Sequence, residues 1–342
     1  MLRRLLCLAL LVPALATAAP ADKGGDKDKA GWLTQAEAWV GRIWNRRDAA
    51  EWLEQIGKAL REQNYQGTLV MVAGGRIETV SIFHAYADGV ERERLVTQSG
   101  PRRELVRSDQ RVMVVGAEAG SAVAYDANPG GKWNPAERFA DAARLEGYRA
   151  RLGGTERVAG YPAQVVELAA KDDWRYGYRL WLEKKSGLPL RLALLDGSGR
   201  TLEQVAFTDI ELGRAPSDAD LRPTGKDAMH RVQTLAPGVV SDPGWRVAAP
   251  PPGFSLRSAR RLGKAVQLLY GDGLASVSVY IEPAPAGAAG QSASRSGAVN
   301  AQAVWKGGRR VLAIGKVPAA TVQHFARSVQ PAPPAGSGQA RP

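Results

Sequence analysis

The chain has 342 residues, of which 44% are hydrophobic, and 46 Lys and Arg against 34 Asp and Glu give it a formal net charge of +12. This length and apolar fraction allow two domains of ordinary size with real cores, and they exclude a chain too polar to fold. The positive charge would suit nucleic acid, an anionic membrane surface or an acidic protein.

The first 18 residues have the pattern of a secretory signal peptide. Arg3 and Arg4 precede an apolar run over residues 5–15, and the small-residue sequence ATA ends the segment. The apolar run is too short to span a bilayer comfortably, so we expect export from the cytoplasm with cleavage after Ala18, rather than a retained anchor. Cleavage would remove the single cysteine and leave a soluble protein without thiol or disulfide.

Two helices are predicted before the first strand. Residues 19–47 are interpreted as a polar tether followed by an extra amphipathic helix at 32–46. A clearer helix begins at Asp48, because Glu51 three residues later completes the spacing of a capping box. The apolar residues of this second helix recur every four positions as far as Leu60.

From Tyr65 the apolar period changes to two, which is typical of strands. A strong hairpin signal at Gly74-Gly75 leads into a meander, then a Gly- and Ala-rich stretch at 116–132, and then a helix that opens at Asn134-Pro135. Strands then resume, so residues 48–212 are predicted to form one large domain with an antiparallel sheet and helices.

The rest of the chain is predicted to form a linker and a second domain. Residues 213–244 are rich in Pro, Gly, Asp and Ser without a sustained period. Residues 245–330 contain strands around a turn at Gly271-Asp272-Gly273 and close with a helix in AATVQHFARSV. The tail at 331–342 has a composition typical of disorder. The predicted fold class is mainly β, with a large sheet domain and a small α+β domain.

The stretch KDDWRYGYRLWLEKKSGLPLRL, which begins at Lys171, interleaves basic and aromatic residues as some nucleic-acid surfaces do. Strand alternation places two tyrosines and two leucines on one face, and the arginines with Trp181 on the other. A stacking surface would keep charge and exposed rings together. The pattern therefore favours a half-buried strand of an antiparallel sheet, and we expect no nucleic-acid partner.

The sequence contains no recognisable catalytic or metal-binding motif. Its three histidines, His84, His230 and His324, have no paired metal-ligand spacing and are interpreted as surface or packing residues. No nucleophile elbow or phosphate-binding loop occurs. We therefore expect a binding protein with no catalytic residue, cofactor or metal.

Several stretches, in order along the chain, resemble one known family. ALREQNYQGTLV, GPRRELVR, ERVAGYPAQVV and WRYGYRLWLEKKSGLPLRLALLD look like the N-terminal domain of the MucB/RseB family. PPGFSL, LLYGDGLASVSVYIEP and GKVPAATVQHFARSV look like its C-terminal domain. The resemblance runs from Trp52 to Val329, and the extra helix at 32–46 and the stretch at 116–132 depart from it.

This resemblance implies a periplasmic negative regulator of an envelope-stress sigma factor of the sigma-E/AlgU type. Such proteins bind the periplasmic domain of a membrane-spanning anti-sigma factor, protect it from regulated proteolysis and are released by lipid-type signals. The implied larger domain resembles the lipoprotein-carrier (LolA/LolB-like) fold, a curved half-barrel with helices on its concave side. Acyl lipid, lipopolysaccharide or a mislocalised lipoprotein would be the ligand, and a homo-oligomer is compatible with this reading.

A curved sheet covered by helices can leave an apolar cavity for acyl chains. Trp133, Phe139, Tyr178 and Leu180 are the candidates for its lining. The alternative is that these four residues are ordinary core.

Eight arginines are the candidate contacts with an acidic partner, which would be the anti-sigma factor's periplasmic segment or lipid phosphates. The alternative for each is a solvated basic surface. The eight are Arg102, Arg103, Arg175, Arg179, Arg260, Arg261, Arg309 and Arg310.

Three functions remain open at this point. The stress regulator needs both domains. A periplasmic lipid or lipoprotein carrier would need only the first, so the second domain at 245–330 argues against it. An envelope enzyme of unrecognised type is disfavoured by the missing motifs.

Overall fold

The computed structural model describes residues 47–108, 111–116, 122–126, 135–144, 146–224, 240 and 242–332. The predicted signal peptide, the tether with the helix at 32–46 and most of the tail lie outside these residues. So does much of the predicted linker. The described residues from Asp48 onward belong to one compact unit.

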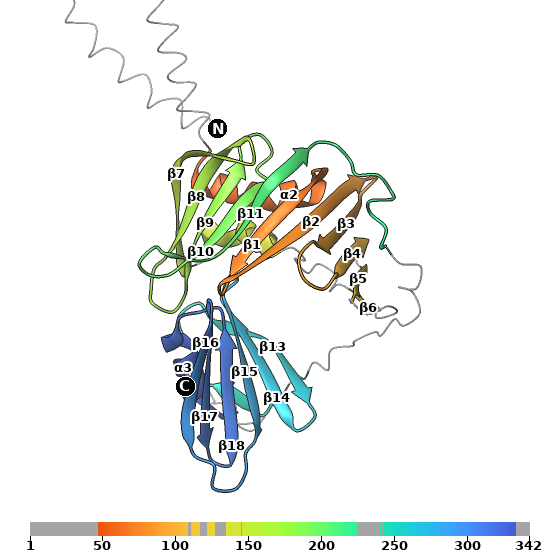
Figure 1. Ribbon diagram of the computed structural model, residues 1–342. Coiled ribbons are helices and arrows are strands. Elements are labelled where there is room, and N and C mark those ends of the chain that lie inside the picture. The colour runs from red at the N-terminus through yellow and green to blue at the C-terminus, as the bar shows by residue number, and fades with distance from the viewer. Residues whose placement is uncertain are drawn as a thin grey trace, which may run out of the picture. The chain divides into compact units, whose positions relative to one another are not determined.

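The larger sheet of the described chain has 11 antiparallel strands, in the order β6-β5-β4-β3-β2-β1-β11-β10-β9-β8-β7 (Figure 1). The first strand pairs with the last, so two meanders join along the β1–β11 seam. The strands are β1 (Tyr65–Ala73), β2 (Arg76–Ala87), β3 (Val90–Thr97), β4 (Glu104–Ser108), β5 (Arg111–Val115), β6 (Ala122–Asp126), β7 (Tyr148–Val158), β8 (Tyr161–Ala170), β9 (Gly177–Glu183), β10 (Pro189–Leu195) and β11 (Thr201–Leu212).

The hairpin predicted at Gly74-Gly75 is confirmed. Val72 pairs with Ile77, and the two glycines have φ values of +57° and +77°. Positive φ at both central positions gives a turn whose twist matches that of the flanking strands, and glycine reaches it without steric cost.

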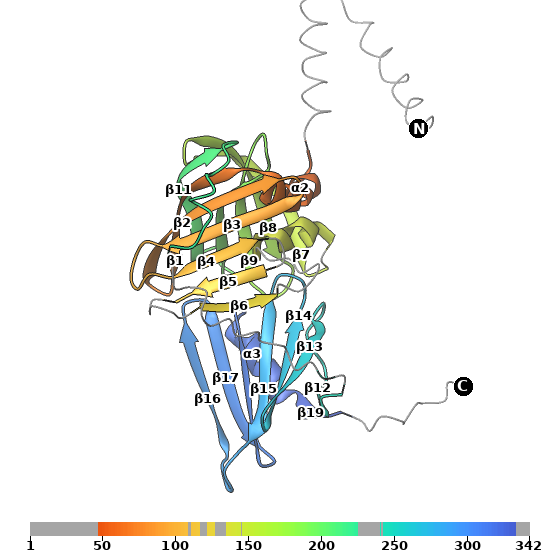
Figure 2. The ribbon, with the colours of Figure 1, turned by 90° about the vertical axis from the view of Figure 1, so that its right-hand side faces the viewer.

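Two helices cover one face of this sheet, which curves around them (Figure 2). Helix α2 (Ala49–Glu62) begins at Asp48, and the predicted capping box is confirmed because Asp48 and Glu51 bond each other's backbone N–H. Its apolar stripe, including Leu53 and Ile56, is fully buried against the sheet. The helix expected after Asn134-Pro135 is the 3₁₀ helix η2 (Pro135–Arg144), which packs on α2.

Strand β9 departs from the half-buried strand that alternation predicted. Leu180 and Leu182 are fully buried, as expected, but Trp181 on the opposite face is only 3% exposed. The Trp181 indole N–H donates to Glu156 at 2.7 Å, and the Arg191 guanidinium lies 4.1 Å above its ring. The prediction of a solvent-facing side was therefore wrong at Trp181, because β7 supplies a polar partner and β10 supplies a cation that cover it.

A smaller antiparallel sheet follows, in the order β13-β14-β15-β18-β17-β16. One face of it packs against α3 (Ala319–Arg327), the predicted closing helix, through Val322, Phe325 and Ala326. A two-stranded sheet of β12 (Trp245–Val247) and β19 (Val329–Pro331) completes this part. The strands of the smaller sheet are β13 (Ser255–Leu262), β14 (Ala265–Gly271), β15 (Ser276–Pro283), β16 (Gly290–Ser296), β17 (Val299–Lys306) and β18 (Arg309–Gly315).

The β1–β11 seam contains a close backbone approach that only glycine allows. A Cβ at Gly67 would lie 2.9 Å from the Cα of Ile210 and closer still to the Asp209 carbonyl, beside a register shift in β1. We expect Gly67→Ala to lower the free energy of unfolding by about 1–3 kcal/mol, because the seam must open. Urea denaturation would measure this.

Gly154→Ala is the matched control, because a Cβ at Gly154 would meet nothing within 4 Å. It should change the free energy of unfolding by less than about 0.5 kcal/mol. Equal effects of the two substitutions would contradict the steric account of the seam.

Candidate functional site

An apolar cavity of about 570 Å³ opens beside the larger sheet. Its walls include Met71 and Val72 of β1, Leu192 of β10 and Val205 of β11, so the β1–β11 seam forms much of its floor. Residues of the smaller sheet, such as Ile314, also line it. The volume falls within the range of small-molecule sites, and the mostly apolar lining fits an apolar ligand.

Few charged groups border this cavity. Arg138 of η2 is exposed and lines it, while Glu203 and Lys316 form an ion pair at 2.6 Å. A cavity with apolar walls and charges at its margin suits an amphiphile, whose chain would enter while its polar head remained near the charges.

Two of the three candidate lining residues that the structure describes line the cavity. Phe139 and Tyr178 line the cavity, with their ring centroids 4.9 Å apart in an edge-to-face arrangement. Leu180 is fully buried in the core and does not line it. Trp133 lies outside the described residues. Sequence reasoning missed the β1, β10 and β11 side chains, because in the sequence they alternate like any strand residues.

The structure places Arg175 inside the protein and not on the exposed surface expected for a partner contact. It is only 3% exposed, and its guanidinium donates to Asp172 at 3.0 Å, to Asp272 at 2.5 Å and to the Pro252 carbonyl at 2.5 Å. Asp272 also accepts from the backbone N–H of Ala275 at 2.7 Å. The Arg175 guanidinium thus joins Asp172, the Pro252 carbonyl and the turn at Asp272, which the sequence indicated only as a turn.

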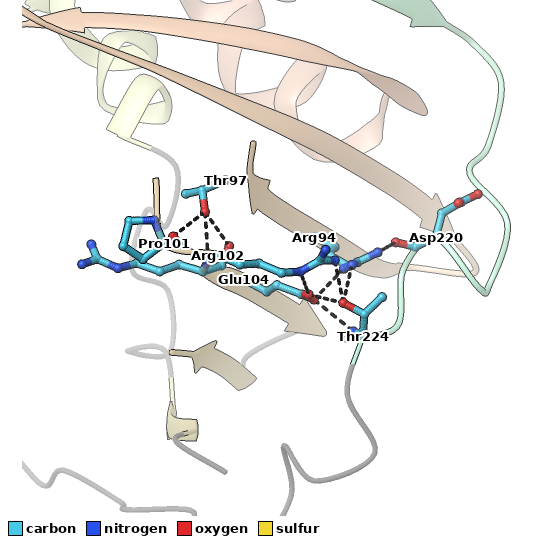
Figure 3. Close-up of polar contacts among 8 residues, drawn as sticks. Arg94, Thr97, Pro101, Arg102, Glu104, Asp220 and Thr224 are labelled. Carbon is cyan, nitrogen blue, oxygen red and sulfur yellow. Dashed lines mark hydrogen bonds and ion pairs between the residues drawn. The ribbon is translucent and has the colours of Figure 1, made fainter. Parts of the chain in front are cut away.

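Arg102 belongs to a polar cluster around the buried carboxylate of Glu104 (Figure 3). Glu104 is 3% exposed and accepts from the Nε atoms of Arg94 and Arg102, each at 3.0 Å, and from the backbone N–H of Thr224 at 3.1 Å. The Thr224 hydroxyl also contacts this carboxylate, and Arg94 donates to the Asp220 carbonyl at 3.0 Å. The cluster therefore fastens the segment that leaves the larger sheet onto β3 and β4.

These contacts change the acidity of Glu104. Burial alone would raise its pKa, but the hydrogen bonds from Thr224, Arg94 and Arg102 outweigh burial and lower the pKa from 4.5 to about 2. The carboxylate is thus held in its charged form, which is the form that the three donors stabilise.

The other candidate arginines divide into two groups. Arg103 is exposed, and Arg179 pairs with Glu167 at 2.7 Å, both on the larger sheet. The remaining four, at 260, 261, 309 and 310, lie at one end of the smaller sheet, because the β13–β14 and β17–β18 turns are at the same end. The sequence alone did not bring these four together.

His84, which the sequence analysis interpreted like the other histidines as a surface or packing residue, is buried, with 1% exposure. Its Nδ1 lies 2.7 Å from the Gln63 carbonyl, its Nε2 lies 3.1 Å from Glu91, and its ring stacks on Tyr65 at 4.7 Å. His324 contacts the Ala249 carbonyl, and His230 lies outside the described residues. Over the part of the chain that the structure describes, no group of three potential ligands could hold a metal ion.

Among the described residues, the structure contains no helix with the length and apolar character that a membrane span requires.

Comparison with known proteins places both sheets in one family. Residues 48–225 match the family model of the MucB/RseB N-terminal domain, and residues 240–330 match that of the MucB/RseB C-terminal domain. The chain is 35% identical over 298 residues to the sigma factor AlgU regulatory protein MucB of Pseudomonas aeruginosa, covering 83% of this chain and 91% of that protein. It is 25% identical over 292 residues to the sigma-E factor regulatory protein RseB of Escherichia coli K12, with 81% and 89% covered.

Solved structures agree with this assignment. The complex structure of Pseudomonas aeruginosa MucA/MucB superposes with a TM-score of 0.69 at 33% identity, over 83% of this chain and 98% of that chain. A crystal structure of MucB in complex with MucA(peri) gives a TM-score of 0.68 at 33% identity, over 83% and 99%.

The lowered pKa of Glu104 predicts acid sensitivity. The folded pKa of about 2 lies below the ordinary value of 4.5, so the ionised cluster stabilises the fold above pH 4.5, and this stabilisation is lost as pH falls toward 2. At neutral pH it amounts to about 3 kcal/mol at most. The difference in free energy of unfolding between wild type and Glu104→Gln should be largest at neutral pH and shrink below pH 4.5, by urea denaturation at a series of pH values.

Glu167→Gln is the control, because it also breaks a Glu–Arg pair, but one whose side chains are 38% and 39% exposed. Its cost should stay below about 1 kcal/mol. A Glu104→Gln effect as small as this, or one independent of pH, would show that the cluster does not hold the fold.

Proposed function

Because the chain belongs to the MucB/RseB family, we propose that it binds the periplasmic domain of a membrane anti-sigma factor and so restrains an envelope-stress sigma factor. The observation that carries this proposal is that the chain matches both family domains in order. In addition, the MucB structure solved in complex with MucA(peri) matches 83% of the chain. The periplasm is the compartment this requires, and the signal-peptide pattern at 1–18 supports it.

The inhibitory step that we propose is protection from proteolysis. A protease needs its substrate segment extended and accessible, and a bound regulator denies both. Restraint of the sigma factor then depends on affinity alone, so this chain needs no catalytic residue of its own. Any signal that lowers the affinity would expose the anti-sigma factor.

The apolar cavity supports lipid sensing as the release mechanism. A ligand can change partner affinity only if it binds the free and partner-bound states differently. The cavity wall includes Val72 and Val205 from the larger sheet and Ile314 from the smaller one, so an acyl chain there would contact both sheets. Such contacts give the ligand a means to favour one packing of the chain over another.

A periplasmic lipid or lipoprotein carrier is the second candidate function, and the same cavity favours it. A carrier would need the larger sheet but not the smaller one. The match of residues 240–330 to the second family domain therefore supports the regulator over the carrier.

Calorimetric titration of the chain from residue 19 with the periplasmic domain of the same organism's anti-sigma factor tests the proposal. We expect binding, and we expect an acylated peptide to weaken it, because ligand and partner are coupled through one protein. Absence of binding at high micromolar concentration would contradict the proposed regulatory function and would favour the lipid or lipoprotein carrier.

The cavity's part in release is tested by Val72→Asp. Val72 lines the cavity and is 38% exposed, so the substitution should leave the fold intact while placing a charge in the acyl site. A charge there should cost acyl binding about 1–3 kcal/mol, which is roughly 5-fold to 150-fold in affinity. The acylated peptide should then release the anti-sigma domain only at correspondingly higher concentration.

Leu152→Asp on β7 is the control, because Leu152 is similarly exposed, at 42%, and does not line the cavity. It should leave both partner binding and release unchanged. If Val72→Asp weakens anti-sigma binding itself, or if both variants alter release equally, this cavity is not the acyl site.

A further inference from the structure

The positive charge of the chain is concentrated in its smaller domain. Residues 245–330 contain eleven Lys and Arg but only two carboxylates, Asp272 and Glu282, whereas residues 48–212 contain 22 Lys and Arg against 24 Asp and Glu. Such an imbalance between halves of a chain indicates an anionic partner for one half. The partner must therefore be sought on the smaller sheet.

Six of these cations lie at one end of the smaller sheet. Its register places the β13–β14 turn, the end of β15, the start of β16 and the β17–β18 turn at this end. The opposite end carries Asp272, which is already paired with Arg175. We call the first end the basic end, and its cations are Arg260, Arg261, Lys264, Lys306, Arg309 and Arg310.

Most of this charge is not neutralised within the protein. Of the two carboxylates in residues 245–330, Glu282 is the one at the basic end, and it pairs with Arg310 at 2.6 Å. Arg260, Arg261 and Lys264 are exposed, and no ion pair to them is present among the described residues. From Ser255 to Gly271, both strands of this hairpin lack any Asp or Glu.

Apolar and aromatic groups accompany the cations. Leu262, beside the turn of the β13–β14 hairpin, is 49% exposed. The Arg309 guanidinium lies 5.7 Å from the Trp245 ring centroid, and that of Arg310 lies 5.7 Å from the centroid of Trp305. Tryptophan and an exposed leucine among cations are the combination that favours a membrane interface, where one part of a side chain is apolar and another is wet.

We propose that the basic end docks on the surface of an anionic phospholipid bilayer. Its cations come from separate turns at the end of a sheet and line none of the three described cavities. That arrangement fits an extended charged surface better than a single acidic peptide, which would be bound along a groove. Leu262 would enter the headgroup region while Arg260, Arg261 and Lys264 contact phosphates. This inference does not depend on the proposed regulatory function.

Sedimentation with lipid vesicles tests the proposal. The protein from residue 19 should bind vesicles containing about one phosphatidylglycerol in four lipids, and not vesicles of phosphatidylcholine alone, with affinity that falls as salt rises. Each cation near such a surface is worth roughly fivefold in affinity. Arg260→Glu/Arg261→Glu should therefore weaken binding at least about tenfold, and Leu262→Ser should weaken it severalfold without altering its salt dependence.

Arg149→Glu/Arg151→Glu on β7 is the matched control, because it makes the same charge change at two exposed arginines of the larger sheet. It should leave vesicle binding nearly unchanged. An equal loss in both double variants would mean that net charge alone causes the binding, and no binding to the anionic vesicles would also overturn the proposal. Intact vesicle binding together with weakened anti-sigma binding in Arg260→Glu/Arg261→Glu would assign the basic end to the protein partner instead.

Discussion

The pairing of β1 with β11 is the contact on which the rest of the structure depends. It joins the first and last strands of the larger domain from Tyr65 opposite Leu212 to Ala73 opposite Glu203, with one register shift after Thr68. Without it, two separate meanders would each expose a sheet edge and half of the core. With it, one continuous sheet curves around α2 and η2, and the apolar cavity forms where β1, β10 and β11 lie side by side.

Buried charges then fix the segments that leave this sheet. Removing a carboxylate and a guanidinium from water costs free energy, which is offset only when nearly every donor and acceptor is satisfied. Glu104 meets that condition through two arginines and Thr224, and Arg175 meets it through two aspartates and a carbonyl. Such buried pairs add little to the net free energy of unfolding. Breaking one leaves an uncompensated buried charge, which is strongly destabilising, so these pairs specify the path of the chain.

The two sheets also divide the chemistry between them. The larger one has nearly balanced charge and forms most of the wall of the apolar cavity, while residues 245–330 carry eleven Lys and Arg against two carboxylates. The proposed regulator of a membrane-spanning anti-sigma factor would work close to a bilayer. A basic end on the smaller sheet would hold it at that surface and raise its local concentration near the partner, and the cavity would remain free to sample acyl ligands.

The sequence by itself determined the local elements, because periodicity, capping and turn chemistry act over a few residues. The capping box at Asp48, the Gly74-Gly75 hairpin and the closing helix of the second domain all follow from such signals. The family-like stretches, taken in their order along the chain, were also enough to identify the family. Tertiary structure alone decided which side chains meet across long sequence separations. It buried Trp181 and Arg175, kept Leu180 out of the cavity that Phe139 and Tyr178 line, and gathered four arginines at one end of the smaller sheet. The physical reason is that burial and pairing depend on strand register and curvature, which no short stretch of sequence encodes.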